Sequence, residues 1–136
     1  RGRLGRQDRS ARIEQLAQQE VTALNHARQL FEENHYDLSV IETWKAIEAR
    51  LHRVLIDRGI TPRQYTHDGL IRAVKRTGAL REPALRLLQE AEQQWKIAIS
   101  TEPLSKDAAQ AVLDAARQVL ATIPLRDLAA ASAPLT

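Results

Sequence analysis

Hydrophobic residues recur every three or four positions along most of the chain, and no segment alternates hydrophobic and polar residues for long. This period is typical of amphipathic helices that bury one face. A first helix is predicted from Asp8 or Ser10 to about Asn34. Its apolar stripe is formed by Ile13, Leu16, Ala17, Val21, Leu24, Ala27 and Phe31.

A second helix is predicted after the turn at residues 34–37, with Asp37 or Ser39 as N-cap and Gly59 as its stop. Its inward positions are Ile41, Trp44, Ile47, Leu51, Val54 and Leu55. In the connector that follows, Thr61 and Pro62 favour a single helical turn.

Three more helices complete the pattern. Thr66 is expected to cap a short helix over about 66–77, which Gly78 ends. A fourth helix is expected from about 82 to 100, and Ser105 opens a fifth that Pro124 ends. Long helices joined by short loops pack antiparallel. We therefore predict an all-α fold, an up-down bundle of four main helices plus one short helix.

The composition agrees with a single helical domain. The chain has 136 residues, 43% of them hydrophobic, and contains no cysteine, which excludes disulfides and thiolate metal sites. No apolar run is long enough to span a membrane, and the lack of cysteine favours a cytoplasmic setting. Methionine is absent even at position 1, so we expect a piece of a longer protein.

Positive charge is concentrated at the start of the chain. Residues 1–12 carry five arginines against one acid, Asp8, a balance of +4, whereas the whole chain carries +3, so residues 13–136 sum to −1. The arginines are Arg1, Arg3, Arg6, Arg9 and Arg12. Such an arm suits RNA, an anionic lipid surface or an acidic protein patch, and it equally suits a solvated linker. We expect residues 1–12 to be a basic arm or linker, 13–123 the bundle domain, and 124–136 a flexible tail.

Groups that could carry out catalysis are few. No two of the four histidines have the i, i+4 spacing that presents a pair to zinc, and the glycines form no phosphate-binding loop. We therefore expect no metal and no cofactor. Glu48 interrupts the apolar stripe of the second helix; it is either satisfied across the bundle or lines a binding groove. His67 is expected to start a helix and face a neighbouring one, and Trp44 and Trp95 are expected in the core.

The order of several residues resembles helical domains of the HEPN superfamily, and the resemblance covers about residues 15–123. The residues that carry it are Ala23, Leu24, Tyr36, Ser39, Trp44, Glu48, Leu51, Leu55, Gly59, Thr66, His67, Leu70 and Ile71. Ribonucleases of that superfamily place an Arg before a His, with four to six residues between the two, near the end of the penultimate helix. The matching window here, residues 95–101, contains neither, although Lys96 and Ser100 are candidate binding residues. Arg28 and His35 have the bare spacing but lie at the end of the first helix.

The stretch from Trp44 to Thr66 is also similar to a cytosolic helical domain behind the membrane spans of bacterial transglutaminase-like proteins. The arginine arm agrees with that resemblance because positive residues collect on the cytoplasmic side of a membrane span.

Three functions compete. The first is a non-catalytic HEPN-like interaction or regulatory domain that forms a homodimer or binds a protein partner. The second is a ribonuclease with a displaced site that uses Lys96, Arg28 or His35. The third is a nucleic-acid binder that works through the arm.

Overall fold

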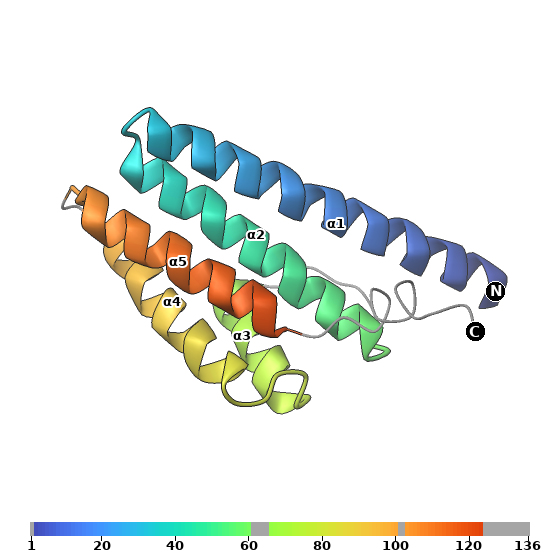
Figure 1. Cartoon of the computed structure of the whole chain (residues 1–136). Coiled ribbons are helices and arrows are strands. Elements are labelled where there is room, and N and C mark those ends of the chain that lie inside the picture. Colours follow the sequence, from blue (N-terminus) through green and yellow to red (C-terminus); the bar gives the residue numbers. More distant parts are fainter. Residues whose placement is uncertain (1, 61–65, 101–102, 124–136) are drawn as a thin grey trace, which may run out of the picture.

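The computed structural model describes residues 2–60, 66–100 and 103–123, with side chains from Arg9 onward. Within these ranges the chain forms five helices and no strand (Figure 1). They are α1 (Gly2–Glu32), α2 (Tyr36–Asp57), α3 (His67–Arg76), α4 (Ala84–Ala98) and α5 (Lys106–Thr122). The predicted all-α fold, with one short helix among four longer ones, is confirmed. None of the helices in these ranges is long and apolar enough to cross a bilayer.

Helix α2 is the central element and packs against the other four helices. Figure 1 shows α1 and α2 side by side and antiparallel, with α4 and α5 as a second antiparallel pair on the other side of α2. The main core forms where α2 faces α3, α4 and α5. Its fully buried side chains include Trp44, Ile47, Leu51, Leu70, Val74, Leu88 and Val119.

Several helix ends agree with the sequence. The Thr66 hydroxyl accepts a hydrogen bond from the Gly69 N–H at 3.0 Å, and the Ser105 hydroxyl accepts one from the Ala108 N–H at 3.1 Å. Each therefore caps its helix by satisfying one of the free amides of the first turn. Gly59 follows α2 with a φ of 85°, a left-handed conformation that side chains disfavour.

The predicted cap of α2 is wrong. The helix begins at Tyr36 after His35, which makes no side-chain cap. The Asp37 carboxylate instead accepts the Leu104 N–H at 3.0 Å, which fixes the α4–α5 turn, and the Ser39 hydroxyl donates to the Ala27 carbonyl at 2.7 Å. Both candidates serve contacts with distant segments, which local capping rules do not anticipate.

Helix α1 also differs from its prediction because it starts at Gly2 rather than near Asp8. No proline interrupts residues 2–12, so the helix extends through them. The division into arm, bundle and tail stays a prediction. The expected turn at Thr61 and Pro62 and the expected tail lie outside the described residues.

A buried ion pair fastens α1 to the bundle. Glu20 of α1 is 7% exposed, and Arg50 of α2 donates from Nε and Nη2 to its two carboxylate oxygens, both at 2.7 Å. The same guanidinium donates from Nη1 to the Leu120 carbonyl near the end of α5 at 3.0 Å. Arg53 lies 3.5 Å from the carboxylate. One carboxylate and one forked cation thus join three helices.

Replacing Glu20 with alanine should lower the free energy of unfolding by about 3 kcal/mol, because it leaves the part-buried Arg50 guanidinium without its anion. Urea denaturation measures this, with Glu14→Ala, an exposed glutamate on the same helix, as the matched control. A loss for Glu20→Ala no larger than that of the control would contradict the importance of this pair.

Candidate functional site

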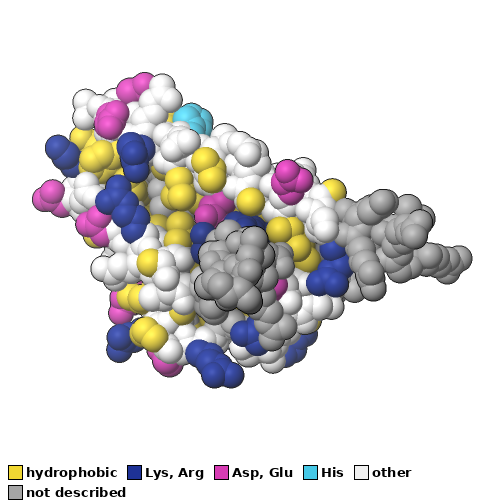
Figure 2. Space-filling view, turned by 45° about the vertical axis from the view of Figure 1, so that its right-hand side comes forward, with side chains coloured by type: hydrophobic (Ala, Val, Ile, Leu, Met, Phe, Trp, Pro, Cys, Tyr) yellow, Lys and Arg dark blue, Asp and Glu magenta, His cyan; other side chains and the backbone are white. Residues whose placement is uncertain are grey.

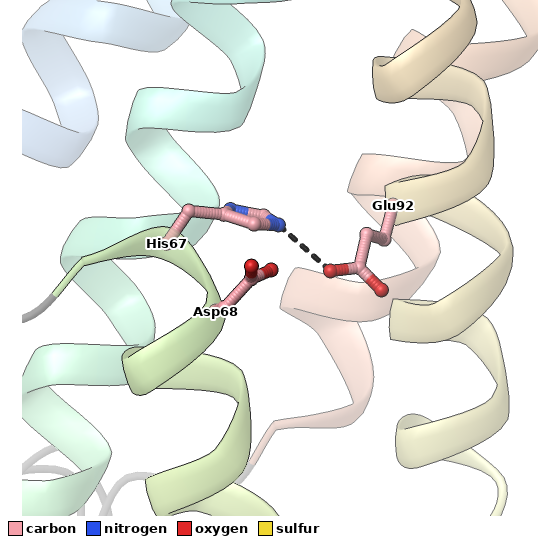
Figure 3. Close-up of side chains that lie close together, drawn as sticks. All are labelled: His67, Asp68 and Glu92. Carbon is pink, nitrogen blue, oxygen red and sulfur yellow. Dashed lines mark hydrogen bonds and ion pairs between the residues drawn. The ribbon is translucent and has the colours of Figure 1, made fainter.

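His67 is the meeting point of three helices. It is the first residue of α3, directly after the Thr66 cap. The Trp44 indole of α2 donates from Nε1 to His67 Nδ1 at 3.0 Å. His67 Nε2 lies 2.7 Å from the Glu92 carboxylate of α4, as Figure 3 shows. The expectation that His67 starts a helix and faces a neighbouring one is confirmed.

These partners fix the position of the proton on the imidazole. An indole N–H can only donate, so His67 Nδ1 must be the unprotonated acceptor, and Nε2 carries the hydrogen that is donated to Glu92. The ring also stacks on Trp95 with a centroid distance of 4.4 Å, and Trp95 stacks on Trp44 at 5.3 Å. The side chain of His67 is 17% exposed. Hydrogen bonds thus engage both ring nitrogens of His67, and Trp95 covers one face of the ring.

Asp68 lies beside His67 and Glu92, and their ligand atoms all fall within 4.8 Å of one another (Figure 3). A metal ion needs an unprotonated ring nitrogen. Here the lone pair of Nδ1 accepts the Trp44 N–H, and Nε2 bears the proton. Unless the Trp44 bond breaks, the ring offers no nitrogen to a metal or to a reacting proton. The cluster is better suited to holding helices together than to coordination chemistry.

Glu48 lies one turn after Trp44 on α2. Its Oε2 is 3.9 Å from His67 Nδ1, too far for a hydrogen bond, and no other described residue donates one to it. The side chain is 33% exposed. Burial raises the pKa of the Glu48 carboxyl, while His67 and Lys45 act in the opposite direction. Glu48 thus lines a groove and also approaches His67 across the bundle, so both alternatives drawn from the sequence stay predictions.

That groove lies between α1 and α2 and encloses about 700 Å³. It is lined by Arg12, Gln15, Leu16, Gln18, Gln19, Thr22, Ala23, Glu42, Lys45, Glu48, Ala49 and His52. Leu16, Ala23 and Ala49 are the buried apolar residues among them. Burial, followed by the nearby Arg12 charge, lowers the pKa of His52 below its ordinary value of 6.5, so its ring is neutral at neutral pH.

The remaining candidate residues do not meet. Lys96 is exposed on α4, and the Ser100 hydroxyl donates to the Ile97 carbonyl of its own chain segment at 2.7 Å. Arg28 lines a hollow of about 150 Å³ between α1, α2 and α5, whereas His35 lines another beside Tyr36. Within the described ranges, no hydrogen bond or ion pair joins Lys96, Ser100 or Arg28 to the His67 cluster.

The arginines of the predicted arm are partly engaged. Arg9 donates to the Ile56 carbonyl at 2.8 Å, and Arg12 donates to Gln15 Oε1 at 2.8 Å. Arg1 and the side chains of Arg3 and Arg6 lie outside what the structure describes. On the face drawn in Figure 2, acidic and basic side chains are interspersed, with hydrophobic ones between them. The described part of this face therefore has no broad patch of a single charge.

A comparison with family models decides the family. The model of the HEPN domain matches residues 13–126, which is most of the chain. The chain belongs to the HEPN family. No curated protein and no solved structure matches it. In this HEPN domain, Trp95 and Lys96 lie in the last turn of α4, Ser100 follows the helix, and Trp95 stacks on His67.

Two acidic residues of this structure are not candidates from the sequence. Glu92 lies three residues before Trp95, and Glu20 lies four residues after Leu16, so both interrupt an apolar stripe as Glu48 does. An acidic residue on an apolar stripe is therefore the sign by which the sequence could have revealed them. Their partners, His67 and Arg50, are 25 and 30 residues away on other helices and cannot be read from spacing.

Replacing His67 with phenylalanine keeps an aromatic ring in the stack but removes both hydrogen bonds. The Trp44 N–H and the Glu92 carboxylate then lose their partners. We expect a loss of about 2 kcal/mol in the free energy of unfolding. Urea denaturation beside His26→Phe, at a histidine 53% exposed, provides the measurement and its control. Equal stability of the two variants would argue against a structural role for His67.

Replacing Glu48 with glutamine should stabilise the folded chain in dilute solution at neutral pH, with a rise in Tm of about 2 °C. A carboxyl whose pKa is raised by folding binds more protons in the folded state, so its ionisation above the ordinary value of 4.5 costs stability. The gain should shrink as the pH falls toward 4.5, where the native carboxyl takes up its proton. A variant that is less stable than the wild type at pH 7 would contradict the sign.

Proposed function

We propose that this HEPN domain is a non-catalytic interaction and regulatory domain that self-associates. The observation that carries the proposal is the state of His67. Both of its ring nitrogens are engaged within the chain, by Trp44 and Glu92, so the histidine with acidic neighbours is occupied by structural bonds. The groove between α1 and α2, by contrast, is open. This distribution of groups favours binding over chemistry.

The arrangement of the other candidates also supports a binding role. Cleavage of an RNA phosphodiester by side chains requires a base and a charge-stabilising group that can reach the same atoms. Lys96 and Ser100 come just after Trp95, which is stacked on His67. The Ser100 hydroxyl donates a hydrogen bond to the Ile97 carbonyl of its own segment. Arg28 and His35, which have the spacing of the ribonuclease pair, line separate hollows.

Incubation of the purified chain with single-stranded and structured RNA tests the absence of catalysis. We expect no cleavage above that of a variant carrying both Lys96→Ala and His35→Ala, because neither residue lies in a constellation that could act. Cleavage by the wild type that this double variant loses would establish a displaced active site and refute the proposal.

Self-association is tested separately by sedimentation velocity over a range of protein concentrations. We expect the average sedimentation coefficient to rise toward that of a dimer as concentration increases. A chain that remains monomeric at the highest concentration reached would contradict this part of the proposal, whatever the RNA experiment shows.

A further inference from the structure

The groove between α1 and α2 has the form of a docking surface. It extends from Arg12 to Ala23 along α1, three turns of helix or about 17 Å. Ala23 and Ala49 lie at its base, are 7% and 4% exposed, and are small enough to let another helix approach closely. A concave strip between two antiparallel helices, apolar at the base and polar at the rim, is a recurrent binding surface for helices.

The charges along this groove alternate in order. At one end Arg12 lies next to His52, whose pKa its charge lowers. Glu48, then Lys45, then Glu42 follow along α2 toward the other end. With His52 neutral, the sequence of charges is positive, negative, positive, negative.

When this order of charges is reversed and laid against itself, every positive charge stands opposite a negative one. Arg12 stands beside His52, so His52 marks its level along α2. The midpoint between Lys45 and Glu48 and the midpoint between Glu42 and His52 then lie within about 1 Å of each other along the helix axis. An antiparallel copy centred there would bring Lys45 against Glu48 of the partner subunit, and Arg12 to the level of Glu42 of the partner subunit on the neighbouring helix. A surface of this kind is self-complementary around a two-fold axis.

We propose that two copies of this chain associate groove to groove, with α2 antiparallel to α2 of the second copy and the two-fold axis between Lys45 and Glu48. Glu48 of each copy then pairs with Lys45 of the partner subunit, and Arg12 pairs with Glu42 of the partner subunit. The proposal rests on the self-association proposed above and specifies the surface that performs it.

The surroundings of Glu48 favour this occupant. Its carboxylate is two-thirds covered and receives no hydrogen bond from the described residues, and His67 Nδ1 lies 3.9 Å from its Oε2. Lys45 of the partner subunit supplies an ammonium group. Within one chain Lys45 donates to Glu42 at 3.0 Å, but its side chain is 60% exposed, and contacts of such exposed pairs are weak. Lys45 can therefore leave Glu42 of its own chain and pair with Glu48 of the partner subunit at little cost in free energy.

Charge reversal tests the pairing. Glu48→Lys and Lys45→Glu each place like charges opposite one another twice in the dimer, because the two-fold axis repeats every change. We expect either variant alone to raise the dissociation constant of self-association by roughly tenfold or more, measured by sedimentation at low salt.

An equimolar mixture of the two variants provides the decisive readout. In a mixed dimer the lysine introduced by Glu48→Lys faces the glutamate that Lys45→Glu places on the other copy, and the unchanged Lys45 and Glu48 also face each other. The mixture should therefore associate about as tightly as the wild type. Loss of folding in a variant could not produce this recovery.

Asp114 and Arg117 on α5 supply the matched control, since they are an exposed pair with the same i, i+3 spacing. Asp114→Lys and Arg117→Glu should leave self-association unchanged. Circular dichroism should give the same helix content for all four variants.

The outcomes separate this proposal from the one on which it rests. If the wild type dimerises and the groove variants dimerise equally well, the surface is wrong while self-association stands. If the single variants weaken association but their mixture does not restore it, the antiparallel pairing is wrong and the groove accepts a different helix. A wild type that stays monomeric overturns both proposals.

Discussion

The arrangement of α2, α3 and α4 depends on one imidazole ring. The Trp44 indole donates to one nitrogen of His67, the other nitrogen donates to Glu92, and Trp95 covers a face of the ring. These contacts join three helices at a single point and fix the tautomer of the ring. The same bonds that make His67 structurally valuable remove the lone pair that a general base or metal ligand requires. The contacts that join the three helices at His67 therefore also engage both of its ring nitrogens.

Two glutamates on the facing helices α1 and α2 differ in how they are paired. Glu20 is buried and paired on both oxygens by Arg50, which also reaches a carbonyl of α5. Glu48 is two-thirds covered on a neighbouring wall, yet no described donor satisfies it. Burial raises the pKa of the Glu48 carboxyl, so its ionised form lowers the stability of the fold. In the proposed dimer, Lys45 of the partner subunit would offset this cost.

Much of this fold could be predicted from the sequence, because helical periodicity and capping are local. Thr66 and Ser105 cap the helices they were expected to cap, and Glu48 stands out as an acid on an apolar stripe. The contacts that assemble the helices are not local. Asp37 resembles a helix cap but binds the Leu104 amide, 67 residues away. The partners of Glu20 and Glu92, and the order of charges along the groove, become visible only when separate helices are placed side by side.

We expect the α1–α2 groove to be the surface used for binding. A dilution series of amide spectra of the ¹⁵N-labelled chain tests this most directly, because it reports every interface residue without substitution. We expect concentration-dependent shifts at residues 12–23 and 42–52, and constant positions for the indole N–H of Trp44 and the amides of α4. Shifts that concentrate on α4 around Lys96, with the groove unchanged, would contradict it.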